Sequence, residues 1–183
     1  MMPMADVKPV VSFQFRSVIV NQITFLPSLP QIGKHFETVA ITAGNDAADN
    51  SNIEDFFGEC LSSKNLKNLR LSRLALTKTM RTNLTRRFMK ADLEQIRLSE
   101  LTFDKLLFGL HHQDVKKAIQ KWVKAEKPTF RKLELSCQNR VLIDEKTLVN
   151  QATQQKAGIS IFREQNSEKM EDYPIWRLHF TVQ

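Results

Sequence analysis

Cysteine is scarce in this chain. Cys60 and Cys137 are the only two among 183 residues, and they stand far apart without a Cys-x-x-Cys spacing. Neither a disulfide framework nor a zinc site is indicated by this spacing, so we expect both thiols to be small buried apolar groups. Also missing are an apolar run of the roughly 18 residues that a transmembrane helix needs and the charged-then-apolar start of a signal peptide. We therefore expect an intracellular protein, cytoplasmic or nuclear.

Signatures of catalysis are missing as well. The sequence contains no Gly-rich phosphate loop, no nucleophile elbow and no metal-ligand spacing. The only suggestive cluster is His111-His112-Gln113-Asp114, but adjacent histidines cannot both face one metal from a helix or a strand. We expect Asp114 to cap a helix instead. The sequence thus predicts no enzyme, no catalytic residue, no metal and no cofactor.

The remaining composition is that of a globular domain. Hydrophobic residues make up 42% and charged residues 26%, and twelve Phe residues argue against disorder. A chain of this length buries roughly 70% of the surface that its unfolded form exposes, which is enough for one core. The net charge of +7 permits an acidic partner or nucleic acid without requiring either.

A short apolar-x-x-apolar-x-apolar kernel recurs along the chain. It is clearest at Leu66/Leu69/Leu71 and Leu93/Ile96/Leu98, and these two copies are separated by 27 residues. Four more copies are Val10/Phe13/Phe15, Phe36/Val39/Ile41, Phe130/Leu133/Leu135 and Ile175/Leu178/Phe180. The shorter spacings approach those of leucine-rich repeats, in which each unit contributes a strand and a helix. We predict an α/β, leucine-rich-repeat-like solenoid of about six irregular strand-helix units.

We expect one repeat domain over residues 1–183, with 1–35 as an atypical N-terminal cap, 36–92 as basic repeat units and 93–183 as the C-terminal part. The first strand is expected over Val10–Val20, because this stretch alternates apolar and polar residues. Later strands are expected at Phe36–Thr42, Phe130–Ser136, Ile159–Phe162 and Ile175–Val182.

Several helices are expected between the strands. Ile53, Phe56, Phe57, Cys60 and Leu61 follow the 3.6-residue period, behind a capping box of Ser51 and Glu54. Val115, Ala118, Ile119, Trp122 and Val123 do the same, with Asp114 as the expected cap. The other expected helices start at Thr77 before Met80, at Asp104 before Leu106, Leu107 and Leu110, and near Asp144 with Leu148, Val149 and Ala152, the last ending at Gly158.

Residues that alternate with the kernels should face outward from the strands. This pattern places Arg70 beside Arg97, with Glu134 on the next strand, and it puts Ser72, Ser99 and Ser136 in one row. The predicted partner-binding residues are Asn68, Arg70, Ser72, Gln95, Arg97, Ser99, Lys132, Glu134, Ser136, Arg177 and His179. Like charges on neighbouring strands weaken pairing by a few tenths of a kcal/mol, roughly, unless an anion lies between them. We therefore expect an acidic protein to contact Arg70 and Arg97, although both could be merely solvated strand residues.

Basic residues concentrate in one window. From Lys64 to Arg97 there are ten Lys and Arg residues against Asp92 and Glu94, a net charge of +8. Arg81, Arg86, Arg87 and Lys90 fall on one expected helix and could follow a phosphate backbone. The aromatic residues that single-strand binders use for base stacking are missing there, apart from Phe88. A nucleic-acid-binding module over residues 64–97 is therefore the alternative function.

Two segments resemble a known family. In Asp114–Leu135, Trp122, Lys124, Pro128, Phe130 and Leu133 follow the order helix, Trp, Lys, Pro, apolar, Leu-x-Leu, which is similar to the F-box-associated domain expanded in nematodes. Gly158–Arg163 is similar to the Gly-x-Asp-Ile-x-Arg strand near the end of that family, although Ser160 replaces the Asp. The resemblance covers residues 93–183, and no F-box pattern precedes it.

The resemblance implies the substrate-recognition part of an F-box type ubiquitin-ligase adaptor. A ligase scaffold would then be a partner only if an F-box exists. The residues themselves predict a protein-protein interaction module with an extended surface, and no membrane partner.

Overall fold

The computed structural model describes residues 13–14, 17–20, 33–42, 54–104, 106–137, 141–143, 147–163 and 176–183. The strands are β1 (Phe13–Gln14), β2 (Ser17–Val20), β3 (Thr38–Thr42), β4 (Asn68–Ser72), β5 (Gln95–Ser99), β6 (Thr102–Phe103), β7 (Leu106–Leu107), β8 (Lys132–Cys137), β9 (Thr147–Val149), β10 (Lys156–Arg163) and β11 (Trp176–Val182). The helices are the 3₁₀ turn η2 (Gly33–His35), α1 (Glu54–Ser62), α2 (Lys78–Lys90) and α3 (His112–Lys124).

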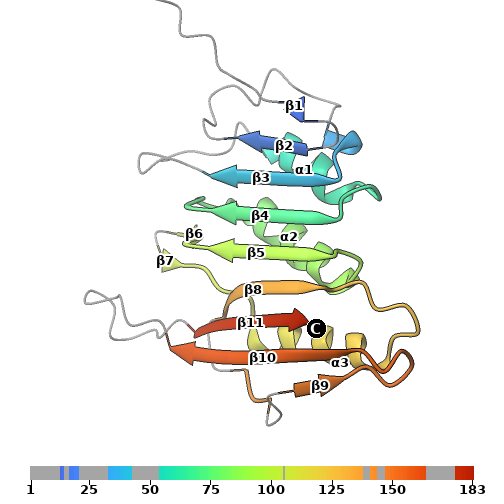
Figure 1. Ribbon diagram of the computed structural model, residues 1–183. Coiled ribbons are helices and arrows are strands. Elements are labelled where there is room, and N and C mark those ends of the chain that lie inside the picture. Colours follow the sequence, from blue (N-terminus) through green and yellow to red (C-terminus); the bar gives the residue numbers. More distant parts are fainter. Residues whose placement is uncertain are drawn as a thin grey trace, which may run out of the picture.

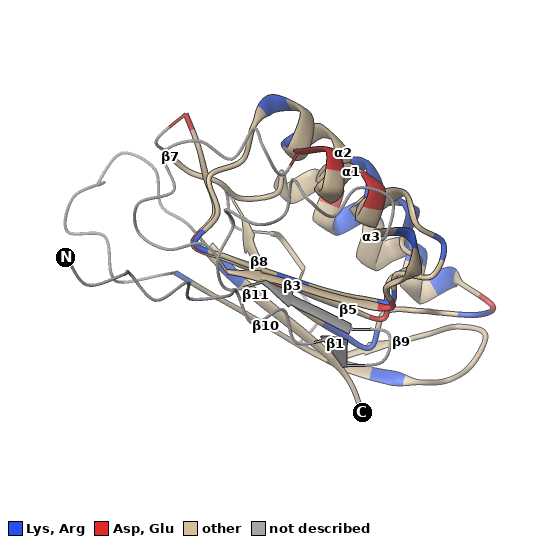
Figure 2. Cartoon of the chain, turned by 90° about the horizontal axis from the view of Figure 1, so that it is seen from above, with Lys and Arg blue, Asp and Glu red and all other residues tan. Residues whose placement is uncertain are grey.

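The described strands form a mixed sheet in the order β1-β2-β3-β4-β5-β8-β11-β10-β9, beside a small ladder of β6 and β7. Helices α1, α2 and α3 pack in one layer against one face of this sheet (Figures 1 and 2). The expected α/β class is therefore confirmed. Within the described residues, no helix combines the length and the apolar character needed to cross a membrane.

Strands β2, β3, β4, β5 and β8 run parallel, and the kernel residues of β3, β4, β5 and β8 lie directly opposite one another. Val39, Leu69, Ile96 and Leu133 form one row, which Phe180 of β11 continues. All five side chains are buried. Side chains alternate between the two faces along each strand. Every second residue of these strands, including the members of this row, therefore faces the helices.

The first repeat unit differs from the prediction. The expected strand over Val10–Val20 contains two short strands, β1 and β2, which pair antiparallel. The residues opposite Val39 and Ile41 are Val18 and Val20 of β2, not residues of the predicted kernel around Phe13. A long stretch of alternating apolar residues is compatible with several registers, so the alternation alone could not choose this one.

The last part of the chain also differs from the prediction. Strand β11 runs antiparallel to β8 and β10, and the stretch expected to be helical around Leu148 holds strand β9. Leu148 is buried between the exposed Thr147 and Val149, which is the alternation of a strand. Gly158 lies inside β10 rather than at a helix end, and Asp144 lies outside the described residues. The six-unit solenoid is not confirmed.

Asp104 and Asp114 were both predicted to be helix N-caps, and neither of them is one. Asp104 adopts φ 50° at the turn between β6 and β7, and Leu106 and Leu107 are exposed in β7 rather than helical. The N-cap of α3 is His111, and Asp114 lies in the first turn of the helix. Carboxylates favour the first helical turn as well as the cap itself, so the residue type did not fix the boundary.

The three main helices themselves agree with the prediction. The amide of Met80 donates to the Thr77 hydroxyl at 3.1 Å, so Thr77 caps α2 as expected. The apolar faces of α1 and α3 are buried, including Cys60, and Cys137 is buried in β8. The prediction that both cysteines are buried is confirmed, and this burial raises the pKa of both thiols to about 12. Ser51, the other half of the expected capping box, lies outside the described residues.

Asn150 is a fully buried polar residue that the sequence reading did not single out. Its Nδ2 donates to the carbonyl oxygens of Trp122 and Ala125 at the end of α3, and its Oδ1 accepts from the amides of Ala152 and Thr153. The last carbonyls of a helix have no partner within the helix. One side chain therefore satisfies the end of α3 and shapes the turn that follows β9.

Replacement of Asn150 by Asp should lower the free energy of unfolding by about 2–3 kcal/mol, because a carboxylate oxygen would face two carbonyl oxygens. Urea denaturation followed by circular dichroism measures the change. Gln151→Glu is the matched control, since it makes the same amide-to-carboxylate change at an exposed neighbour. Equal effects of both substitutions would contradict the assigned role of Asn150.

Candidate functional site

The polar positions of the strands lie on the sheet face opposite α1, α2 and α3, and we call this face the polar face. The register brings the predicted residues into rows that cross the strands. Asn68, Gln95 and Lys132 form the first row, Arg70, Arg97, Glu134 and His179 the second, and Ser72 and Ser99 the third. Ser136 and Arg177 pair on β8 and β11. The structure therefore brings all eleven predicted residues onto one face.

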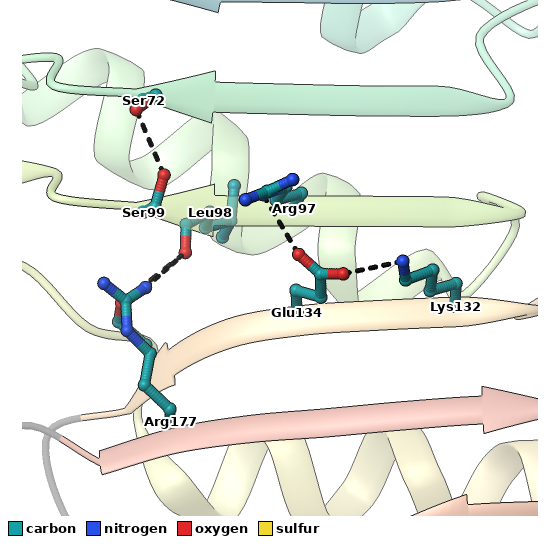
Figure 3. A network of polar contacts seen from close by, with 8 residues as sticks. Ser72, Arg97, Leu98, Ser99, Lys132, Glu134 and Arg177 are labelled. Carbon is teal, nitrogen blue, oxygen red and sulfur yellow. Dashed lines mark hydrogen bonds and ion pairs between the residues drawn. The ribbon is translucent and has the colours of Figure 1, made fainter. Parts of the chain in front are cut away.

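Glu134 links two of the cations in this face (Figure 3). Its carboxylate accepts from Lys132 Nζ at 2.7 Å and from Arg97 Nε at 3.0 Å. The hydrogen bond from Lys132 lowers the pKa of Glu134, partial burial opposes this, and the charges of Arg97, Lys132 and His179 lower the pKa further. The carboxylate is thus ionised at neutral pH and holds Arg97 and Lys132 in place.

Arg70 is in a different situation from Arg97, although the two lie side by side on β4 and β5. Its side chain is exposed, and it forms no ion pair with another described residue. On its other side in the same row stands Ala40 of β3, a short side chain that leaves space. The row therefore contains one cation neutralised by Glu134 and one that lacks a described counter-charge.

At the other end of this face, Arg177 closes a divergence between β5 and β8. The paired residues of these strands end at Arg97 and Glu134. Beyond them, Arg177 Nη1 donates to the Leu98 carbonyl at 3.2 Å (Figure 3). The same nitrogen donates to Ser136 Oγ at 2.9 Å. Ser136 is only 5% exposed. Arg177 and Ser136 therefore hold the sheet together here, and Ser136 is not available to a partner in this arrangement.

The polar face is hollowed in two places that share Arg97 and Glu134. A hollow of about 320 Å³ is lined by Asn68, Arg70, Gln95, Arg97, Lys132 and Glu134, among others. A larger hollow of about 900 Å³ lies toward the strand ends, beside Ser72, Ser99, Phe162, Arg177 and His179. Both volumes fall within the range of known ligand-binding pockets, about 300–1,000 Å³.

Arg73, Glu100 and Phe162 are among the residues of the larger hollow that the sequence did not predict. Arg73 and Glu100 follow Ser72 and Ser99 at equivalent positions of the repeat, with φ 53° and 52°. Their side chains form an ion pair with 3.1 Å between Arg73 Nε and Glu100 Oε2. Alignment of the two repeat copies would have shown this exchange of charge sign. Phe162, which is 45% exposed and packs edge-on against His179, had no comparable signal.

The phosphate-tracking stripe that the sequence allowed on α2 loses one of its four basic residues, Arg87. Arg87 is 3% exposed, forms an ion pair with Asp92 and donates to the Leu66 carbonyl at 3.0 Å. The Arg81 guanidinium lies 4.3 Å above the centre of the Phe103 ring. The 3.6-residue period brings Arg87 onto the buried side of α2. The number of basic residues in the window therefore overstates how many of them are exposed.

His111 and His112 contact each other with ring centres 4.6 Å apart. No group of three or more His, Cys, Asp or Glu side chains in the described part of the chain could hold a metal ion.

Comparisons with known proteins gave no match: no family model, no curated protein and no solved structure is significantly similar to this chain.

Replacement of Arg177 by Met should lower the free energy of unfolding by about 1–3 kcal/mol, because the hydrogen bonds from Arg177 to the Leu98 carbonyl and to Ser136 Oγ are lost in a part-buried site. Chemical denaturation checks this value. Arg163→Met, at an exposed position of the neighbouring strand β10, is the control. If Arg177→Met is as stable as the control, Arg177 does not close the divergence of β5 and β8.

The lowered pKa of Glu134 gives a pH-dependent prediction. Its contribution to stability is fully present above the pKa of the unfolded state, about 4.3, and is lost as the pH falls through the lower folded-state pKa. At neutral pH we expect Glu134→Gln to cost roughly 0.5–1 kcal/mol, and this difference should shrink at pH values below the folded-state pKa. Denaturation of both proteins at several pH values measures it, with Glu126→Gln reporting the loss of an exposed carboxyl charge. A difference that grows as the pH falls would refute the prediction.

Proposed function

We propose that the protein is a protein-recognition module and that its polar face binds an acidic partner. The observation that carries this proposal is the adjacency of Arg70 and Arg97, one of which has no described counter-charge, beside the hollow of about 320 Å³. Charged groups of this kind contribute partner selection and association rate, because opposite potentials attract and like potentials repel.

The architecture supports the proposal because strands hold their side chains in fixed rows. We infer that β2 to β5 and β8, with the helices between them, form leucine-rich-repeat-like units, although β11, β10 and β9 extend the sheet in another way. Parallel units of this kind present extended binding surfaces. Side chains on such strands need little reordering when a partner binds, which reduces the entropic cost of association.

A narrower role as the substrate receptor of an F-box type ubiquitin ligase, inside the cell, belongs to the same proposal. Its support is the resemblance of Asp114–Leu135 and Gly158–Arg163 to the F-box-associated domain. The alternative, nucleic-acid binding by residues 64–97, is weakened by the burial of Arg87 and by the ion pairs of Arg73 and Arg97.

The double substitution Arg70→Glu/Arg97→Glu should abolish capture of acidic proteins from nuclease-treated cell extract, because it reverses the charge of the central row. The control is Arg86→Glu/Lys90→Glu, which makes the same charge change at exposed positions of α2. Quantitative mass spectrometry of the captured proteins is the readout. Arg70→Glu alone serves as a second variant, since Arg97→Glu also places two carboxylates side by side.

An acidic segment of each lost protein is then synthesised and titrated against the unaltered chain. Binding that needs Arg70 supports the proposal, and recovered ligase scaffold subunits support the narrower role. A parallel capture uses untreated extract. Proteins that are captured only there, that are retained by Arg70→Glu and that are lost in the α2 control would replace the proposal with the alternative.

A further inference from the structure

The hollow beside Arg70, which we call the Arg70 hollow, has a charge that suggests what it binds. Among the residues that line it, Arg70, Arg97 and Lys132 are cationic and Glu134 is the single carboxylate, so the net charge is +2. Glu134 is already held by Lys132 and Arg97. The excess of two positive charges therefore remains for a ligand.

The three cations come from three neighbouring strands and line one hollow. Arg70 and Arg97 are directly opposite in the register of β4 and β5, and Lys132 lies on β8, next to β5. Glu134 holds Arg97 through Nε, while the Arg97 side chain is still 52% exposed. Guanidinium groups bind phosphate and carboxylate groups through two parallel hydrogen bonds, so two neighbouring guanidinium groups suit a ligand with several acceptor oxygens.

The class of anion follows from the charge and the size. A phosphorylated side chain carries a charge of about −1.5 to −2 at neutral pH and three acceptor oxygens. A single Asp or Glu side chain carries one negative charge and would leave one cation of the hollow without a partner. A phosphodiester backbone carries one charge per phosphate and needs cations repeated along a track, whereas Arg87 is buried and Arg81 lies over Phe103 on the helix side.

We infer that the Arg70 hollow binds the phosphate group of a phosphorylated side chain in the partner protein. This inference rests on the proposed function and specifies the partner's chemistry. Arg70 supplies the guanidinium without a described counter-charge, and Glu134 positions Arg97 and Lys132. The protein would then distinguish the phosphorylated partner from the unphosphorylated one.

The experiment compares three fluorescent peptide pools with degenerate flanking residues and phosphoserine, serine or glutamate at the centre. Each pool is titrated against the full chain and followed by fluorescence anisotropy. The phosphoserine pool should bind about tenfold or more tightly than either of the others, because only phosphate offers three oxygens and a double charge. A single-stranded RNA oligomer with the same total charge as the phosphoserine peptides is titrated against the full chain in parallel.

Three variants locate the binding site. Arg70→Gln should weaken binding of the phosphoserine pool by about tenfold or more, and Arg70→Lys should weaken it less, because it keeps the charge but loses the paired hydrogen bonds. Arg86→Gln on α2 should have no effect. Arg70 is exposed and outside the core, so its substitution leaves folding intact, which thermal melts verify.

The outcomes separate this inference from the proposed function. Equal binding of the glutamate and phosphoserine pools, with dependence on Arg70, would overturn the phosphate inference and leave recognition of an acidic protein intact. Preferred binding of RNA, or binding that depends on Arg86 instead of Arg70, would overturn both. Failure of the phosphoserine pool to bind the unaltered chain would also overturn the phosphate inference, while capture of acidic proteins tests the broader proposal independently.

Discussion

Val39, Leu69, Ile96, Leu133 and Phe180 lie side by side across five strands and are all buried under the helices. Every other feature of the sheet depends on this row. Because side chains alternate along a strand, a shift of one residue in any strand would move its apolar residues to the opposite face and expose them to water. Such a shift would remove several buried side chains, each worth roughly 1.5–3 kcal/mol, from the core. The apolar row therefore fixes the register of the parallel strands.

The same register creates the polar face. The residues between the buried ones are aligned by the same register and also form rows across the strands. Arg70 therefore lies opposite Arg97, and Arg97 lies opposite Glu134. The charge pattern of the proposed binding surface is thus a direct consequence of core packing. Arg177 lies on this face, but its hydrogen bonds to the Leu98 carbonyl and to Ser136 give it a structural role in holding the strands together. Position on the polar face and availability to a partner are different properties.

Several parts of the fold could be predicted from sequence because local patterns agreed with the tertiary structure. The apolar periods of α1 and α3, the Thr77 cap of α2 and the strands around Val39, Leu69 and Ile96 are of this kind. The predictions failed where a short pattern had more than one solution. Leu148 fits a helix face as well as a strand, and the alternating residues before Val20 allow several pairings. Asn150 carried no local signal, because its partners at the end of α3 are more than twenty residues away.

The sequence by itself determined the α/β class and the set of side chains that share the polar face, because alternation along a strand is a local property. Only the tertiary structure decided which basic side chains are available. Arg87 and Arg70 are equally basic in the sequence, yet one is buried against Asp92 and the other is exposed without a described counter-charge. The direction of β11 was also decided there, since a strand can bury the same residues whether it runs parallel or antiparallel to its neighbour. Contacts between distant segments set these outcomes, and no short window of sequence contains them.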